Sequence, residues 1–441
     1  MKINDKKFFE LAKANGINEC DFSYVHSKST SVTIYHHDID SLTESDSHKV
    51  VARGVVNGKF GQGFTEKIDK NTIEFLINSI KETASLIEND DPCIIYKEKC
   101  KYHNKNVFNK DTVSGKLEDK IALLKDIENK LYAYDKRITD VMSVGYEEEF
   151  DESLLSNSYG IRLKDKKATC SIYAEVTAKE GDDIKTGFKV FSSLDFNEFN
   201  EEEFVNDVAK DALDKLGATQ CKSKKYPVVL SQDSFSKLLR PYLSNIDAEE
   251  VQKNSSLFKD KLHQPIASKK LSVIEDNLQK DIFFDYHDDE GVPCVKKDII
   301  KKGILETYIY TLETAQKDGV KPTGNAVRSG KMKAGLSHLI VKNGRKSFDE
   351  MIANIKEGVY ITSLEGLHAG MNAKSGNFSL QSQGFMIRNG KIAEPLTLIT
   401  IAGNLVDVFM NIKDVANDSK LILNGTTTPS VYIKKLAVSG K

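Results

Sequence analysis

The chain has 441 residues, and its 63 basic side chains nearly balance its 65 acidic ones. This length exceeds what one ordinary hydrophobic core needs, so we expect two or three domains. The balance of charge argues against a nucleic-acid-binding protein, which would carry a strongly basic face. No apolar run has the length of a signal peptide core or of a membrane-spanning helix, so we expect a cytoplasmic protein.

The first half of the chain has the pattern of antiparallel sheet covered by helices. Strand-like alternation runs over Ser31–Ile39. A hairpin follows at Asn57-Gly58, because both residues of such a turn need positive φ. Further apolar periodicity predicts helices and a meander of strands, over Met1–Gly16, Asn71–Ile87, Leu117–Leu131, Thr139–Phe150, Gly160–Leu163, Ala168–Ala178, Ile184–Phe191 and Asn200–Gly217.

The main domain boundary is expected at the lysine-rich break that follows, at residues 222–225. We therefore divide the chain into an N-terminal α+β region, 1–222, and a β-rich C-terminal domain, 223–441. The first part can be split further into 1–110 and 111–222. The predicted fold class is α+β: an N-terminal α/β region of antiparallel sheets with covering helices, joined to a domain made mostly of strands. The C-terminal domain is expected to begin with a strand over Tyr226–Leu230 and a helix near Asp233–Ile246. Mostly strands follow, with one later capped helix over Ser347–Lys356.

Histidine and cysteine patterns for a metal site are weak. The six cysteines contain no Cys-x-x-Cys pair. Cys93, Cys100 and His103 form a local run, but a structural zinc usually needs a second tight pair, so we favour a lysine-rich connector there. His36-His37 and His48 lie in the first region. Adjacent histidines on a strand point to opposite faces and do not chelate together.

An acidic cluster with a histidine lies at residues 285–290, where Asp285, His287, Asp288, Asp289 and Glu290 stand close together. One hypothesis is a relocated metal or acid–base site. The other, which we favour, is a solvated acidic turn ahead of a strand at residues 292–298. Motifs of serine hydrolases and of P-loop nucleotide sites do not occur.

Several short motifs, in order and over nearly the whole chain, resemble the TldD/PmbA peptidase family. They are Gly54–Gly63, Leu216–Ala218, Asp288–Pro293, Lys302–Tyr308, Thr323–Arg328 and Ser375–Leu405. The resemblance implies a two-subunit, zinc-dependent peptidase of the bacterial and archaeal cytoplasm that acts in proteolysis or maturation of unfolded peptides. An older description of the family is modulator of DNA gyrase.

In that family the TldD-type subunit carries His-Glu-x-x-x-His on a helix, and a cysteine near the C-terminus completes its zinc site. The PmbA/TldE-type subunit lacks these ligands. Here Arg240, Pro241 and Asn245 stand at the three motif positions, and no cysteine follows Cys294. A guanidinium does not ligate a cation, and proline offers no general base. Pro241 predicts a kink or a helix start.

We therefore expect the PmbA/TldE-like branch. This chain would have no catalytic residue, no metal ligand and no cofactor of its own, and the zinc would lie in a TldD-like partner.

The segment Leu367–Leu380 has the small polar residues and glycines that suit close backbone approach. By analogy with the family we expect a peptide to be held there by added strand pairing. The candidate peptide-binding residues are His368, Gly370, Asn372, Gly376, Asn377 and Ser379.

Three functions remain open. The favoured one is a non-catalytic subunit of a TldD/PmbA-type zinc metallopeptidase complex. The second is a stand-alone, homodimeric peptide-binding or scaffold protein without peptidase activity. The third is an active peptidase whose metal site is built around His287.

Overall fold

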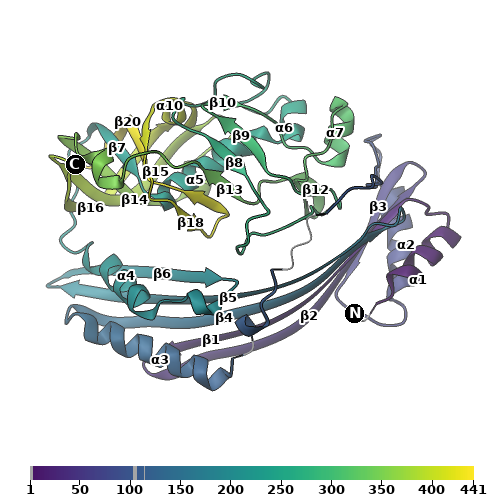
Figure 1. Ribbon diagram of the computed structural model, residues 1–441, viewed down its shortest axis with the longest axis horizontal. Helices are drawn as coiled ribbons and strands as arrows, with labels where there is room; N and C mark the ends of the chain where they lie inside the picture. Colours follow the sequence, from purple (N-terminus) through teal and green to yellow (C-terminus); the bar gives the residue numbers. More distant parts are fainter. Residues whose placement is uncertain (1–2, 103–106, 114) are drawn as a thin grey trace.

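A long, curved antiparallel sheet forms one side of the molecule, and the C-terminal half of the chain lies against its inner face (Figure 1). The computed structural model describes residues 3–102, 107–113 and 115–441. Its mixture of antiparallel sheets, covering helices and a β-rich C-terminal region confirms the predicted α+β class. Within the described residues, no helix combines the length and the apolar character needed to cross a membrane.

The large sheet has the strand order β3-β2-β1-β4-β5-β6. Strands from residues 20–65 and 138–193 therefore belong to one sheet, joined by the pairing of β1 with β4. Four of its strands are 16 to 20 residues long, which lets the sheet span the whole molecule. The strands are β1 (Cys20–Tyr35), β2 (Asp38–Val56), β3 (Lys59–Thr65), β4 (Ile138–Asn157), β5 (Arg162–Glu180) and β6 (Asp183–Ser193).

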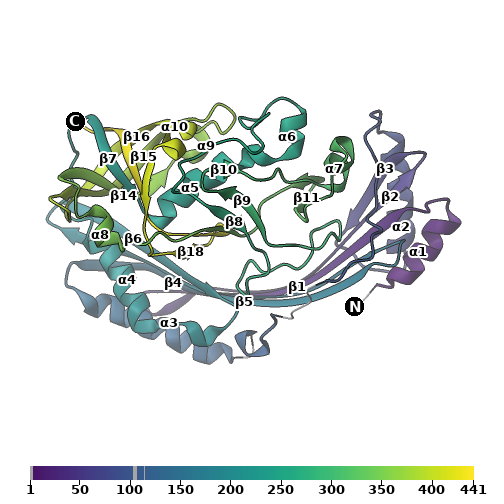
Figure 2. The same cartoon turned by 45° about the horizontal axis from the view of Figure 1, so that its top comes forward.

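Two pairs of helices cover the two ends of the outer face of this sheet (Figures 1 and 2). Side chains alternate between the faces of a strand, so even-numbered residues of β1 point outward along its length. Phe22 packs under the first helix pair and Val32 under the second. The helices are α1 (Asp5–Ala14) with α2 (Thr72–Ser85), and α3 (Leu117–Tyr134) with α4 (Glu201–Leu213); two 3-10 turns are η1 (Lys110–Val113) and η2 (Phe196–Glu198).

The C-terminal half is built on a sheet of order β16-β15-β14-β7-β20-β17, in which β16 also pairs with β20 and so closes a barrel-like ring. A second sheet has the order β10-β9-β8-β13-β19-β18, and β11 pairs with β12. The strands are β7 (Lys224–Leu230), β8 (Val273–Glu275), β9 (Lys297–Lys301), β10 (Ile304–Leu305), β11 (Ala326–Ser329), β12 (Lys331–Ala334), β13 (Leu339–Val341), β14 (Glu357–Glu365), β15 (Asn377–Arg388), β16 (Lys391–Asn404), β17 (Ile412–Val415), β18 (Lys420–Ile422), β19 (Thr426–Thr428) and β20 (Val431–Ser439).

One helix, α5, packs between these two sheets and contributes much of the largest apolar core. The other helices of this half are short and lie at its margins. The helical elements of this half, α5 included, are α5 (Gln232–Leu243), the 3-10 turn η3 (Ser244–Ile246), α6 (Ala248–Gln252), α7 (Leu312–Asp318), α8 (Phe348–Ile352), α9 (Leu367–Gly370) and α10 (Leu405–Met410).

The predicted strand over Ser31–Ile39 is wrong, because β1 and β2 are joined by a tight turn at His36-His37. Both histidines have positive φ, 47° and 65°. Glu128 of α3, a buried side chain, accepts a hydrogen bond from the backbone N–H of His37 at 2.9 Å. The hydrogen bond from His37 to Glu128 of α3 thus stabilises a two-residue turn in which histidine stands where asparagine or glycine is usual.

Two other strand predictions differ from the structure. The strand expected over Gly160–Leu163 begins only at Arg162, after a turn at Gly160, and it continues through Ala168–Ala178 as one strand, β5. The strand expected over residues 292–298 begins at Lys297, because the preceding residues form the acidic loop described below.

Candidate functional site

Two of the three expected motif positions, Arg240 and Pro241, lie at the C-terminal end of α5, and the third, Asn245, lies in the 3-10 turn η3 that follows. Ser231 caps the start of this helix by accepting a hydrogen bond from the N–H of Ser234, and a buried apolar stripe anchors it in the core. Pro241 lies inside the last turn, and the helix continues to Leu243, so the expected helix start at Pro241 is not present.

Arg240 is held by four neutral acceptors. Its Nη1 donates to the carbonyl oxygen of Leu336 at 2.9 Å, and its Nη2 donates to the carbonyl oxygens of Ser337 at 2.6 Å and Gly425 at 2.7 Å. Its Nε lies 3.1 Å from the hydroxyl of Thr426. Burial lowers the pKa of Arg240, although the charge of Glu275 acts in the opposite direction.

Asn245, at the second histidine position, is also committed to structure. Its amide nitrogen donates to the carbonyl oxygens of Tyr242 at 3.2 Å and Ala373 at 3.0 Å, and its amide oxygen accepts from the N–H of Leu257 at 3.1 Å. A zinc ion prefers thiolate, imidazole or carboxylate ligands. A guanidinium, a proline ring and an amide with its oxygen occupied do not fit such an ion.

The bond from Asn245 to Ala373 brings the end of α5 against the segment of the six candidate peptide-binding residues. Gly370 is needed for close approach, because a Cβ there would lie 2.3 Å from the carbonyl oxygen of Ser379. The side chain of Asn372 accepts the N–H groups of Lys374 and Ser375 and so shapes the turn.

The backbone of residues 377–379 is already paired on both sides. Met371 bridges Phe378, and the N–H of Asn372 donates to the carbonyl oxygen of Asn377 at 2.9 Å. On the other side, residues 377–379 pair with residues 402–404 of β16. Residues 377–379 therefore offer no free backbone edge, and added strand pairing along residues 371–373 stays a prediction.

What the segment still offers a ligand is side chains. His368, Asn372, Asn377 and Ser379 are exposed, whereas Gly376 is buried with φ of 75° and Gly370 is partly covered. Their contact with a peptide stays a prediction.

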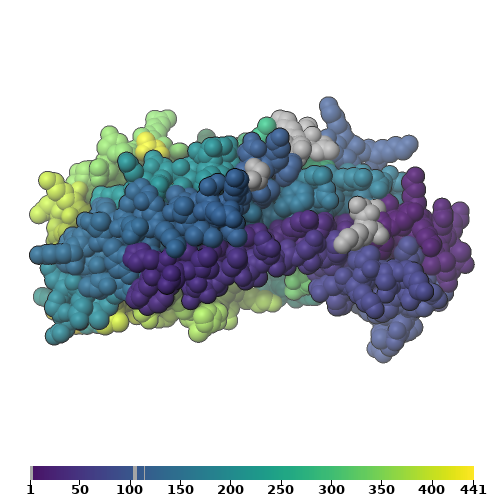
Figure 3. Space-filling view, turned by 90° about the horizontal axis from the view of Figure 1, so that it is seen from below, coloured from purple at the N-terminus to yellow at the C-terminus, as the bar shows by residue number. Residues whose placement is uncertain are grey.

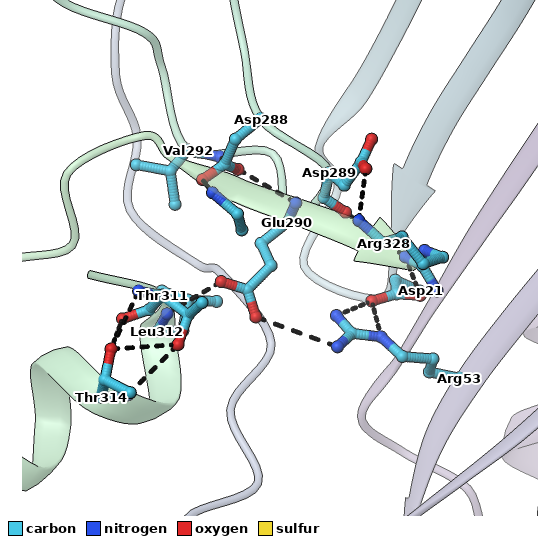
Figure 4. Close-up of polar contacts among 11 residues, drawn as sticks. Asp21, Arg53, Asp288, Asp289, Glu290, Val292, Thr311, Leu312, Thr314 and Arg328 are labelled. Atoms are coloured by element: carbon cyan, nitrogen blue, oxygen red, sulfur yellow. Dashed lines mark hydrogen bonds and ion pairs between the residues drawn. The ribbon is translucent and has the colours of Figure 1, made fainter. Parts of the chain in front are cut away.

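The acidic loop at residues 288–293 is buried for the most part, so the expectation of a solvated turn is wrong for Asp288 and Glu290. One carboxylate oxygen of Asp288 accepts the N–H groups of Glu290 at 3.0 Å and Val292 at 2.9 Å, and the other accepts that of Ala326 at 2.9 Å (Figure 4). Burial raises the pKa of Asp288 to about 6, against the effect of these bonds.

Glu290 points from this loop toward the large sheet (Figure 4). It accepts the N–H of Leu312 at 2.8 Å, and it lies 3.9 Å from Nη1 of Arg53 on β2. Burial raises the pKa of Glu290 to about 7, although the charge of Arg53 acts to lower it. Arg53 in turn donates to Asp21 of β1, and Arg328 of β11 reaches the same carboxylate at 3.4 Å. The loop is thus a charged junction between the sheet and the C-terminal half.

His287, the residue on which a relocated metal site would depend, has both ring nitrogens engaged. Its Nδ1 lies 2.8 Å from the carbonyl oxygen of Asp288 and its Nε2 lies 3.1 Å from Asp165 of β5. Burial acts to lower its pKa, but these partners outweigh burial and raise it. Asp285 and Asp289 are exposed. The structure favours a structural role for this histidine.

The run Cys93, Cys100 and His103 is not assembled into a described site, because His103 lies outside the described residues. Cys93 donates weakly to the carbonyl oxygen of Gly58, and burial raises its pKa. His36 and His37 contact Asp140 and Glu128 at the tip of the β1–β2 hairpin.

The junction pair Asp21 and Arg53 was not found from the sequence. The two residues are far apart in the chain and become opposed only when β1 pairs with β2. An arginine in a strand otherwise rich in small apolar residues was the one available signal.

Comparison with known proteins agrees with this architecture. Residues 223–440 match the PmbA/TldA metallopeptidase C-terminal domain, and residues 115–218 match the PmbA/TldA metallopeptidase central domain. A metalloprotease of Methanocaldococcus jannaschii is 26% identical over 89% of this chain and 88% of its own length. Metalloprotease PmbA of Escherichia coli O157:H7 is 28% identical over 74% of this chain and 70% of its own length.

Two solved structures superimpose over almost the whole chain. One is a protein of Thermotoga maritima described as a proposed modulator of DNA gyrase, with a TM-score of 0.90, 28% identity and 99% of both chains covered. The other is TldE from Thermococcus kodakarensis, with a TM-score of 0.90 at 19% identity, covering 99% of this chain and 100% of that one. The second likeness shows the fold alone.

Proposed function

Because the chain belongs to the TldD/PmbA metallopeptidase family, we propose that it is a non-catalytic, PmbA/TldE-like subunit. Its partner would be a zinc-bearing TldD-like subunit in the cytoplasm, and the complex would act on unfolded peptides. The observation that carries the proposal is the state of Arg240, whose guanidinium donates to three carbonyl oxygens at the position of the first zinc ligand.

The chemistry of hydrolysis supports this assignment. A catalytic zinc needs about three protein ligands, an open position for water and a nearby general base. Here the helix offers a positive charge where the ion would need a donor. Thr426, which lies against Arg240, belongs to a C-terminal tail without cysteine. Restoring a zinc site would therefore require several simultaneous changes.

The test is co-expression with a TldD-like protein from the same source that carries His-Glu-x-x-x-His. We expect the two chains to co-elute in size-exclusion chromatography and this chain to change the rate at which the partner cleaves an unfolded peptide. As a control, changing the glutamate of the partner's motif to glutamine should abolish cleavage while leaving the complex intact. Separate elution together with an unchanged rate would refute the proposal.

The same experiment separates the alternatives. A homodimer of this chain that binds unfolded peptide without the partner would support the stand-alone scaffold. Peptide cleavage by this chain alone, with stoichiometric zinc that is lost on changing His287→Gln, would support an active peptidase.

A further inference from the structure

The outer face of the large sheet carries two histidines directly opposite each other. His26 of β1 pairs in register with His48 of β2, and their ring centroids lie 4.3 Å apart. Asp46 lies on β2 two residues before His48, and so diagonally opposite His26 of β1. Its Oδ1 is 2.8 Å from Nε2 of His26 and 3.7 Å from Nε2 of His48. Both histidines thus direct the same type of ring nitrogen toward one carboxylate oxygen.

The other ring nitrogens face groups that orient them. Nδ1 of His48 lies 3.1 Å from the hydroxyl of Tyr24, and Nδ1 of His26 lies 4.0 Å from Oε2 of Glu152 on β4. In metal centres, a ligating histidine commonly has its second nitrogen held by a carboxylate or another polar group, which fixes the ring orientation. The surroundings of this pair have that arrangement.

The group is accessible to a cation from solvent. The side chains of His26 and His48 are 16% and 12% exposed, whereas that of Asp46 is 52% exposed. The residues lie on the middle of β1 and β2, whose stripe is visible from outside between the helix pairs (Figure 3). One cation is already near, since Nζ of Lys28 lies 3.6 Å from the second oxygen of Asp46, but this lysine is itself more than half exposed.

We propose that His26, Asp46 and His48 bind one zinc ion or a similar divalent cation of borderline softness. Two imidazoles and a carboxylate are ligands that suit zinc, cobalt and nickel. Their donor atoms all lie within 4.8 Å of one another. In a tetrahedral zinc site the ligand atoms are about 3.3 Å apart, so small side-chain rotations would close the group around an ion.

This site lies on β1 and β2, away from α5, and an ion bound there would stabilise the large sheet. β3 pairs with β2 only from Val50 onward, so residues 38–49 of β2 have β1 as their one neighbouring strand among the described elements. An ion held by His26 and His48 would tie these two strands together where no described helix supports them. Metal binding should therefore slow amide exchange in this part of β2.

The experiment uses the full chain without an affinity tag, stripped of metal with a chelator and titrated with zinc by calorimetry. We expect one zinc per chain. His26→Gln and His48→Gln should each weaken binding at least tenfold, and Asp46→Asn should weaken it as well. Affinity should fall in acid, because a protonated imidazole cannot ligate. Cobalt, used as a spectroscopic probe, should give the visible absorption of a four-coordinate site. His36→Asn, at the tip of the same hairpin, is the matched control and should bind zinc as the unchanged chain does.

Hydrogen exchange of β2, measured with and without zinc, provides a readout that does not depend on peptidase activity. The proposal is overturned if the unchanged chain takes up no stoichiometric zinc at micromolar concentration. It is also overturned if His26→Gln and His48→Gln retain the original affinity. Thermal unfolding of the metal-free variants checks their fold; if a histidine variant is unfolded, Asp46→Asn decides the outcome.

Discussion

Arg53 of β2 and Asp21 of β1 face each other across paired strands, with Nε of Arg53 2.8 Å from Oδ2 of Asp21 and both side chains buried. Glu290 and Arg328 approach this pair from the C-terminal half. The junction between the sheet and the C-terminal half therefore contains a series of alternating charges, Glu290, Arg53, Asp21 and Arg328. Its members depend on one another, because each would otherwise be a buried and unpaired ion.

Removing Arg53 should destabilise the protein strongly. Arg53→Met leaves Asp21 and Glu290 near each other without their main cation, and breaking a buried ion pair costs about 3–5 kcal/mol. Urea unfolding measures the change in the free energy of unfolding. Asp126→Ala, which removes an exposed ion pair with Lys130, should cost about 0.5 kcal/mol. Equal losses in the two variants would contradict a buried, interdependent junction.

The junction should also make stability depend on pH. Burial raises the pKa of Glu290 to about 7 and that of Asp288 to about 6, both above their values in an unfolded chain. The folded state then binds more protons than the unfolded state, so this contribution to stability is present in acid and is lost as the pH rises through these values.

The matching variant is Glu290→Gln, which keeps an acceptor for the N–H of Leu312 and cannot ionise. The unfolding free energy of the unchanged protein should rise by about 4 kcal/mol between pH 8 and pH 5, and the variant should lose more than half of that rise. Chemical denaturation across this range is the measurement. Parallel curves for the two proteins would show that Glu290 does not titrate as described.

Arg240 should be a structural residue. Arg240→Met removes the guanidinium donor from the carbonyl oxygens of Leu336 and Ser337, whereas the carbonyl oxygen of Gly425 keeps the N–H of Leu339. We expect a loss of about 3 kcal/mol in unfolding free energy. Lys237→Met, on the same helix, removes a lysine that is one-third exposed and should have a much smaller effect. An unchanged free energy of unfolding in Arg240→Met would mean that water readily replaces the guanidinium at these carbonyl oxygens.

The segment beside α5 can be tested in the reconstituted complex of the proposed function. His368 is exposed, so His368→Asn should leave stability unchanged. If the segment contacts peptide, loss of about 1 kcal/mol of binding should raise KM roughly fivefold with kcat preserved. His263→Asn, another exposed histidine of the C-terminal half, is the matched control. An unchanged KM would remove His368 from the peptide path.

The sequence by itself determined the features that depend on neighbouring residues. The hairpin turn at Asn57-Gly58 and the helix start at Asn200 were predicted correctly. Local backbone preference decides the turn, and the side chain of Asn200, which caps the helix, decides the start. Motif order also indicated the family. The identities of Arg240 and Asn245 led us to expect no zinc ligand at these positions, and that stays a prediction.

The tertiary structure alone decided which distant residues meet. The burial of Asp288 and Glu290, the pairing of Asp21 with Arg53 and the opposition of His26 to His48 all follow from strand register and domain packing. Register assigns each side chain its face and its partner across the sheet, and a change of one residue would separate every such pair. Local sequence patterns do not carry that information. The sequence shows which residues of this protein are charged, but only the folded sheet shows which charged residues contact one another.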